Sequence, residues 1–329
     1  MTTQQSRGVY LITGGASLIG SHIADRLLAD GASEVRLLDN YSLGTPAAVA
    51  HLGDDPRVKR IRGDILRLSD LLEAMQGVDG VFALAGFLTL PMSQDPIVGI
   101  SVNAVGMANT LEACRFAKVR RVVFSSSVAV YGNTSAYPVT EDAGYVSTGL
   151  QPPSLLYSSS KLMGEGLCAR YARSHGVQFN ALRFSSVYGE RQHARAVNAV
   201  FVAQICDQVR RGEAPVIEGD GSEVHDYVYV TDVARACVLA MQSESHGHCL
   251  NIVTGVDSTH TQVAETALRL CGRTDLKPQY REDRRAVRSA AGTRLGFSRE
   301  KAAREIGWEP LVNLEQGMQR LLEWQRSQV

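Results

Sequence analysis

Short apolar runs alternate with longer helical patterns through the first half of the chain. The apolar runs cover residues 9–13, 35–38, 58–61, 81–85, 122–125 and 179–184. Helical patterns lie between them at residues 21–29, 69–77, 97–118 and 155–175. Ser69 is in the right place to be the N-cap of the second helix. Apolar strands separated by helices predict a parallel sheet that is covered by helices on both faces.

The pattern changes after about residue 185. Residues 196–211 read as a helix and residues 215–218 as a short strand, followed by a turn at Gly219-Asp220-Gly221. Apolar runs return at 228–230 and 250–253, with a helix that opens at Thr231 and Asp232 between them. From Thr259 onward the chain reads as helical and carries more charge. The sequence therefore predicts a second, smaller unit, nested because the chain leaves the sheet and returns to it.

A glycine-rich turn joins the first strand to the first helix. It reads Thr13-Gly14-Gly15-Ala16-Ser17-Leu18-Ile19-Gly20. Glycines in such a turn let the backbone approach a pyrophosphate, and the helix N-terminus supplies N–H donors. Asp39 ends the next strand, where a carboxylate binds an adenosine ribose and repels a 2′-phosphate, which favours NAD over NADP. The alternative is that the glycines form only a tight turn and that Asp39 only caps its strand.

The turn and the strand pattern together predict an α/β fold of Rossmann type, a doubly wound parallel sheet with a nested smaller C-terminal substrate lobe. At 329 residues the chain has room for about two such units. We expect an NAD-binding domain at residues 1–185 plus 225–255, and a substrate-binding lobe at residues 186–224 plus 256–329.

Three side chains further along form a candidate catalytic group. Tyr157 and Lys161 are four residues apart on an expected helix, so they lie on one face. A phenol titrates near 10, and a neighbouring ammonium is expected to lower its pKa and favour the phenolate. Ser127, at the end of the strand that begins at residue 122, would hold a substrate oxygen. Taken singly, each could be an ordinary structural residue: one serine of three, a half-buried tyrosine and a solvated lysine.

Motifs along nearly the whole chain resemble the extended short-chain dehydrogenase/reductases, specifically the NAD-dependent epimerase/dehydratase family with its UDP-sugar 4-epimerases. They comprise the turn at residues 13–20, Leu38-Asp39-Asn40, Gly63-Asp64-Ile65, Ser125-Ser126-Ser127, Val130-Tyr131-Gly132, Tyr157-x-x-x-Lys161, Leu182-Arg183-Phe184, Val187-Tyr188-Gly189, Gly219-Asp220-Gly221 and Asp226-Tyr227-Val228.

The resemblance implies roles for residues of this chain. Tyr157 would be the general base or acid, Lys161 would also hold the nicotinamide ribose, and Ser127 would orient the reacting group. The implied cofactor contacts are Gly14, Ser17, Leu18, Ile19, Gly20, Asp39, Asn40, Asp64, Ile65, Ala83, Ala85, Asn103 and Ser125, together with Tyr157 and Lys161. The helices at 97–118 and 155–175 would form a homodimer interface.

Three positions depart from the family pattern. Ser17 replaces a glycine of the cofactor turn, where its hydroxyl would either crowd the pyrophosphate or donate to it. Ser186 replaces the usual asparagine, and His225 the usual arginine that binds a nucleotide diphosphate; imidazole is no equivalent of a permanently charged guanidinium fork. Arg191 and Arg288 are further candidates for binding substrate phosphate or carboxylate, or else solvated surface arginines.

The leading functional hypothesis is an NAD-dependent nucleotide-sugar epimerase, acting at C4 through a keto-sugar intermediate. The resemblance also implies that elimination is disfavoured, because dehydratases of the family usually carry Asp-Glu directly after the serine position, whereas Val128 and Ala129, which cannot transfer protons, follow Ser127 here. The Ser186 and His225 departures motivate an alternative, an NAD-dependent dehydrogenase or ketoreductase of a sugar acid or other alcohol without a nucleotide. A third hypothesis is a non-catalytic NAD-binding protein.

Composition limits the remaining possibilities. The chain has 34 basic and 34 acidic residues, so a general nucleic-acid-binding surface is not expected. Six scattered cysteines without close pairs predict reduced thiols and no metal site.

A polar N-terminus and interrupted apolar stretches predict neither signal peptide nor membrane span, hence a cytoplasmic protein. The seven arginines and one lysine of residues 281–304 would favour an anionic small-molecule substrate if they close over it, whereas a merely solvated face would carry no such implication.

Overall fold

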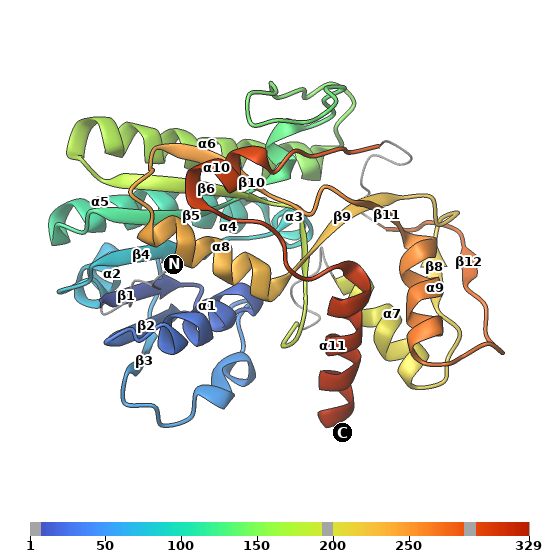
Figure 1. Cartoon of the computed structure of the whole chain (residues 1–329). Coiled ribbons are helices and arrows are strands. Elements are labelled where there is room, and N and C mark those ends of the chain that lie inside the picture. The colour runs from blue at the N-terminus through green and yellow to red at the C-terminus, as the bar shows by residue number, and fades with distance from the viewer. Residues whose placement is uncertain (1–7, 193–199, 286–293, 329) are drawn as a thin grey trace.

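A seven-stranded sheet forms the centre of the computed structural model, which describes residues 8–192, 200–285 and 294–328 (Figure 1). The strand order is β3-β2-β1-β4-β5-β6-β10, and every neighbouring pair is parallel. The strands are β1 (Val9–Thr13), β2 (Glu34–Asp39), β3 (Val58–Arg62), β4 (Gly80–Ala83), β5 (Arg121–Ser127), β6 (Gln178–Phe184) and β10 (His248–Ile252). The order reverses between β1 and β4, which is where such sheets bind ligands. The predicted Rossmann-type doubly wound fold is confirmed.

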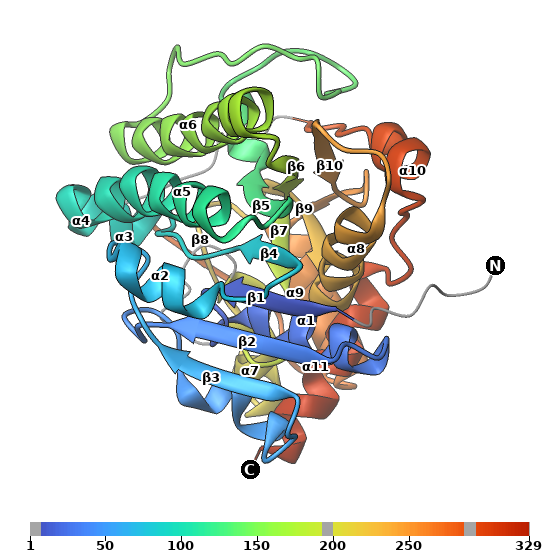
Figure 2. The same cartoon turned by 90° about the vertical axis from the view of Figure 1, so that its left-hand side faces the viewer.

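Helices cover both faces of this sheet, each over its own apolar core (Figure 2). On one face α1 (Leu18–Ala29) packs against α8 (Val230–Gln242). On the other, α5 (Met107–Ala117) packs between α2 (Leu68–Ala74) and α6 (Pro152–His175). The expected N-cap at Ser69 is wrong: α2 begins one residue earlier, and its N-cap residue, Arg67, makes no side-chain capping bond.

The helix expected at residues 97–118 consists of three joined segments. These are α4 (Pro96–Ile100), a π-helical turn η2 (Ser101–Gly106) and α5. Such turns often occur at functional sites, and this one carries Asn103. Within the described residues, Pro96–Ala117 is also the one helix whose length and composition would suffice to cross a membrane, with a mean hydropathy of 1.2. Its inner face contributes to the core beneath α2 and α6.

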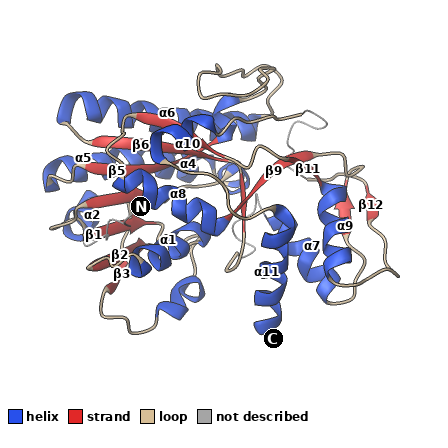
Figure 3. Ribbon diagram, viewed as in Figure 1, coloured by secondary structure: helices blue, strands red, loops and turns tan. Residues whose placement is uncertain are grey.

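A smaller unit lies beside the carboxyl ends of the sheet strands (Figure 1). A three-stranded sheet joins β7 (Ser186–Tyr188), β9 (Val224–Tyr229) and β11 (Asp257–Thr259), and β8 (Val216–Glu218) pairs with β12 (Gln279–Arg281). Helices α7 (Val200–Arg210), α9 (His260–Leu270) and α11 (Leu314–Ser327) complete a third core. Figure 3 shows that strands and helices alternate here as well, although residues 259–329 were expected to be helical throughout.

The chain passes between the two units more than once. Helix α8 and strand β10 follow β9 and return to the large sheet. Helix α10 (Glu300–Ile306) packs against β10 and α8, and Trp308 buries its indole in the same core, donating to the Asp232 carbonyl over 2.8 Å. The connecting elements are η1 (Pro46–Leu52), α3 (Thr89–Gln94) and η3 (Val128–Tyr131).

Candidate active site

The turn after β1 is built around its glycines. Gly14 has a φ of +69°, and its amide donates to the Leu38 carbonyl over 2.9 Å. A Cβ on Gly15 would lie 2.8 Å from Leu37, and a Cβ on Gly20 would lie 2.6 Å from the Gly14 carbonyl oxygen. No side chain fits at either position, so the first turn of α1 can approach both the sheet and a ligand closely.

Ser17 is the N-cap of α1. Its hydroxyl accepts from the Gly20 amide over 3.2 Å and donates to the Gly14 carbonyl over 2.6 Å. The proton of the Ser17 hydroxyl is therefore already used in a hydrogen bond within the turn. The side chains of Leu18 and Ile19 point into the core between the sheet and α8.

A groove with about 550 Å³ of open space runs along the carboxyl ends of β1 to β4. The predicted cofactor residues that line it are Gly14, Ser17, Asp39, Asn40, Asp64, Ile65 and Ala85. The Asp39 carboxylate accepts from the Ala16 amide over 3.0 Å and from the Tyr41 amide over 2.8 Å. The Asn40 amide group donates to Asp64 over 3.3 Å, which connects the ends of β2 and β3. Backbone N–H groups therefore fix the position of the Asp39 carboxylate at the end of β2.

The candidate catalytic side chains meet where α6 crosses β5. Tyr157 and Lys161 are both buried on α6, with exposed fractions of 8% and 7%. The Lys161 ammonium donates to the Ser125 carbonyl over 2.8 Å and lies 5.7 Å from the centre of the Tyr157 ring. Ser127, the last residue of β5, is hydrogen-bonded to the Tyr157 phenol. Tertiary structure thus brings all three together.

The protein environment shifts the pKa of both ionisable groups. Burial raises the pKa of Tyr157 to about 12, although the hydrogen bond from Ser127 opposes the shift. Burial lowers the pKa of Lys161 to about 8, against the opposing charge of Glu165. The expectation that Lys161 lowers the pKa of Tyr157 is wrong for the protein alone, because desolvation of the phenolate dominates.

Asn103 braces this site from the π turn. Its side-chain oxygen accepts from the Phe87 amide over 2.6 Å, while its nitrogen donates to the Phe87 carbonyl and to the Ser160 hydroxyl. Ser160 in turn donates to the Tyr157 carbonyl over 2.7 Å. The loop after β4 is therefore tied to the helix that carries the tyrosine. On the neighbouring strands, the Ser125 hydroxyl donates to the Ala83 carbonyl over 3.1 Å.

A buried ion pair beneath the site was not predicted. Glu165 accepts two bonds from Arg183, at 2.9 and 2.8 Å, and a third from the Ser126 hydroxyl at 2.6 Å. The pair joins α6 to β6, and Ser126 extends the network to β5; α6 and β5 carry the three catalytic candidates. Glu165 lies one helical turn after Lys161, so the i, i+4 spacing could have identified it. Only the fold shows its partner.

Ser186 and His225 are in contact where β7 meets β9. The Ser186 hydroxyl lies 3.1 Å from Nδ1 of His225, and Nε2 of His225 lies 2.7 Å from Glu223. Burial raises the pKa of Glu223, but bonds from His225 and Arg285 outweigh this and lower it to about 2. The two departures from the family pattern therefore form one connected unit.

The arginines proposed for substrate binding have diverse surroundings. Arg191 is ion-paired with Asp25 on α1 over 2.7 Å. Arg288 lies outside the described residues. Within the basic segment, Arg281 pairs with Glu218, and Arg285 pairs with Asp283 and Glu223. Much of the positive charge of this segment is thus neutralised by ion pairs with carboxylates of the same protein.

Comparison with known proteins establishes the family. Residues 10–253 match the model of the NAD dependent epimerase/dehydratase family. The chain belongs to this family. It is 32% identical over 322 residues to the UDP-glucose 4-epimerase of Mycolicibacterium smegmatis, covering 96% of this chain and 98% of the relative.

Two solved structures show the same fold over nearly the whole chain. The UDP-glucose 4-epimerase of Thermotoga maritima, solved with UDP-glucose, has a TM-score of 0.85 at 29% identity, covering 97% of this chain and 99% of the other. That of Thermus thermophilus, in complex with NAD, has a TM-score of 0.84 at 30% identity, with 98% and 100% covered. The chain is an enzyme of an NAD-dependent family, and epimerase is the favoured activity.

NAD, the cofactor of the family, fits the residues present. The glycine turn has no space for a Cβ at Gly15 or Gly20, so it packs closely on the sheet, and Gly14 and Ser17 at the N-terminus of α1 line the groove, where a pyrophosphate would meet the helix N-terminus. The Asp39 carboxylate lines the groove at the end of β2. The Lys161 ammonium lies at the end of β5, held by the Ser125 carbonyl. These are the places that would hold the pyrophosphate, the adenosine ribose and the nicotinamide ribose.

Proposed function

We propose that this protein is an NAD-dependent nucleotide-sugar epimerase that inverts C4 of its substrate. The observation that carries the proposal is the convergence of Ser127, Tyr157 and Lys161 at the carboxyl ends of the strands that also form the cofactor groove. The relatives named UDP-glucose 4-epimerase cover nearly the whole chain and support this activity over others of the family.

The residues would act through proton transfer and orientation. Bound NAD supplies reversible hydride transfer. Ser127 would hold the substrate hydroxyl beside the Tyr157 phenol, and Tyr157 would take the hydroxyl proton as the carbon is oxidised. Once the keto sugar has presented its other face, Tyr157 would return the proton and C4 would have inverted. Lys161 would hold the cofactor ribose and keep positive charge beside the phenol.

The burial of Tyr157 bears on this role. Its pKa of about 12 keeps the phenol neutral near pH 7 in the protein alone, which suits the proton-donating half of the reaction. The base form therefore depends on stabilisation in the complex with cofactor and substrate. Elimination has no proton-transfer group at the two positions after Ser127, which are Val128 and Ala129.

One specific observation favours a second candidate. Arg285, the arginine in contact with the His225–Glu223 pair, is engaged by two carboxylates, which weakens its attraction for a diphosphate. A dehydrogenase or ketoreductase acting on a sugar acid without a nucleotide would need less positive charge here. This enzyme would accumulate NADH in proportion to product, whereas an epimerase regenerates NAD in each cycle.

The test is conversion of nucleotide sugars followed by NMR, with absorbance at 340 nm recorded in parallel. UDP-glucose is the first substrate, followed by other UDP-sugars and by free aldonates. We expect epimer formation without net NADH. Tyr157→Phe should lose at least 100-fold in kcat, whereas Tyr171→Phe, which removes a phenol hydroxyl from the same helix where it bonds Glu112, should not. No conversion of any nucleotide sugar, with NADH formed from a free alcohol, would establish the second candidate.

The domain division and the assembly are further proposals. We propose residues 1–185 plus 225–255 as the NAD-binding domain and the rest as the substrate lobe, with two exceptions in the packing: β9 pairs within the smaller sheet, and α10 with Trp308 packs on the large one. A homodimer through α4, α5 and α6 is supported by apolar side chains on these helices, of which Ile97 is 80% exposed, Phe116 54% and Met163 52%. Ile97→Asp should shift the mass measured by light scattering to that of a monomer. A cytoplasmic location also stays a proposal.

A further inference from the structure

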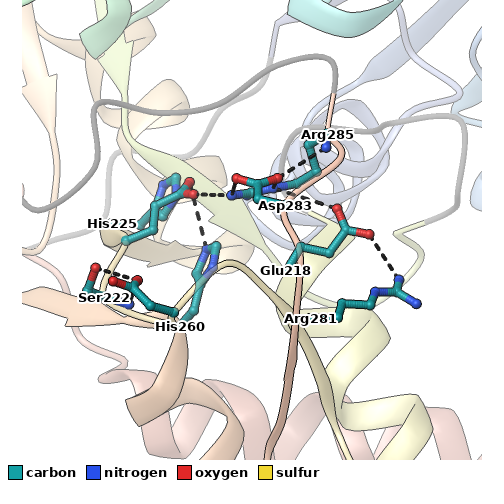
Figure 4. A network of polar contacts seen from close by, with 9 residues as sticks. Glu218, Ser222, His225, His260, Arg281, Asp283 and Arg285 are labelled. Atoms are coloured by element: carbon teal, nitrogen blue, oxygen red, sulfur yellow. Dashed lines mark hydrogen bonds and ion pairs between the residues drawn. The ribbon is translucent and has the colours of Figure 1, made fainter.

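Two histidines and a glutamate, His225, His260 and Glu223, gather in the smaller unit, outside the cofactor groove. Figure 4 labels the two histidines. Glu223 directly precedes β9 and His225 is its second residue, so the extended chain places their side chains on the same side. His260 is the first residue of α9. The antiparallel pairing of β11 with β9 places it beside them, and its amide donates to the Glu223 carbonyl over 3.1 Å.

The spacing of their polar atoms is close to that of a metal site. One candidate ligand atom from each residue lies within 4.8 Å of the other two. Oε1 of Glu223 is 2.7 Å from Nε2 of His225 and 4.0 Å from Nε2 of His260. Ligands of a tetrahedral zinc ion are about 3.3 Å apart, given bonds of roughly 2.0–2.1 Å. Each of these two distances thus has to change by less than about 1 Å to fit that geometry.

Neighbouring groups already hold the outer atoms of two of these three residues, His225 and Glu223. The Ser186 hydroxyl contacts Nδ1 of His225, and Arg285 donates to Oε2 of Glu223 over 2.5 Å. Metal ligands characteristically have such partners, which orient the ligating atom. Oε1 of Glu223 and Nε2 of His225 face each other on the inner side.

His260 supplies an independent indication. It is only 3% exposed and stacks on Phe201, with ring centres 3.9 Å apart. Among the described residues, its Nδ1 has no hydrogen-bond partner. Burying an imidazole nitrogen without a partner is costly. Rotation of the ring about χ2 would turn Nδ1 in place of Nε2 toward Glu223, where a bound ion would satisfy it. The rings of His225 and His260 are parallel within 5°, so one of them has to rotate about χ2 for both nitrogens to face a common ion.

We propose that Glu223, His225 and His260 bind one zinc ion, with a fourth coordination position open to an anionic oxygen of the substrate. Three protein ligands and one open position are typical of zinc sites that contact substrate. The second half of the proposal rests on the proposed function. Ser186 and His225, the departures from the family pattern, then have one explanation: zinc replaces the positive charge of the missing arginine, His225 binds it, and Ser186 orients His225.

Metal binding can be tested without substrate. Tag-free protein is freed of metal with a chelator and titrated with zinc sulfate in competition with a chromophoric chelator, and its metal content is measured by mass spectrometry. We expect one zinc ion per chain. His260→Gln should weaken binding by roughly 100-fold or more, and Ser186→Ala by about 10-fold or more. The control is His248→Gln, since His248 is a partly exposed histidine beside Glu305. Circular dichroism and thermal melting establish that each variant is folded.

The outcomes are separable from those of the epimerase assay. No zinc binding by folded wild-type protein, or equal binding by the His260 and His248 variants, overturns the site whatever the enzymatic activity proves to be. If zinc binds, the affinity for UDP is compared with zinc and with chelator. An increase of at least tenfold with zinc supports the open position, and an unchanged affinity refutes its link to substrate.

Discussion

Lys161 is expected to make the stability of the cofactor-free protein depend on pH. The residue is 7% exposed, and burial lowers the pKa of its ammonium group from 10.5 to about 8. Between these two values the unfolded chain holds the proton and the folded chain has released it. The free energy of unfolding is therefore not reduced by Lys161 above pH 10.5, where the amine is neutral in both states. It decreases as the pH falls from 10.5 through 8. At pH 7 the folded state is destabilised by about 3 kcal/mol relative to a lysine with an ordinary pKa.

The magnitude can be worked out for an accessible range. The two pKa values predict a gain in unfolding free energy of about 0.4 kcal/mol from pH 7 to 8, and about 1.3 kcal/mol from pH 7 to 9. Lys161→Met removes the titrating group and leaves a side chain of similar length. The loss of the bond to the Ser125 carbonyl shifts the stability of the variant by a constant amount. The difference between the two proteins should therefore change with pH by the amounts given.

The assay is urea unfolding at pH 7, 8 and 9 of both proteins, stripped of NAD. Subtraction cancels the other titrating groups, and Tyr157, with its pKa of about 12, contributes little below pH 9. Wild-type stability should rise relative to Lys161→Met as the pH increases. If the unfolding free energy of the wild type minus that of the variant stays constant or falls with pH, the reasoning is refuted. Burial of the Lys161 amine would then not lower its pKa and would not reduce stability near pH 7.

Three further predictions concern the turn and the ion pair. Ser17→Ala removes the N-cap of α1 and should destabilise the protein by about 1 kcal/mol in urea unfolding. Gly20→Ala places a Cβ 2.6 Å from a backbone oxygen and should weaken NAD binding by at least tenfold in calorimetry, whereas Gly166→Ala, with nothing within 4 Å, should not. Glu165→Gln leaves the Arg183 charge buried without its partner and should cost about 3–5 kcal/mol, measured by urea unfolding; a loss below about 1 kcal/mol would contradict the structural role of the pair.

Local patterns in the sequence determined the sheet and the cofactor turn. Alternating strands and helices fix a parallel sheet because buried strands are apolar on both faces, and the residues 9–13 of the first strand agree with the structure. The glycines of the turn and Asp39 could be recognised because their roles depend on the backbone and on a spacing of about twenty residues along one βαβ unit. The i, i+4 spacing likewise indicated that Tyr157 and Lys161 share a helix face.

Tertiary structure alone decided the environments of these groups. The pKa of Tyr157 rises because the phenol is buried, which its distance from Lys161 in sequence could not indicate. Arg183 on β6 forms an ion pair with Glu165 on α6. His260 lies beside His225, which is 35 residues earlier in the sequence, because β11 pairs with β9. Desolvation and contacts between distant segments depend on how elements pack, whereas local periodicity records only which face of each element is apolar.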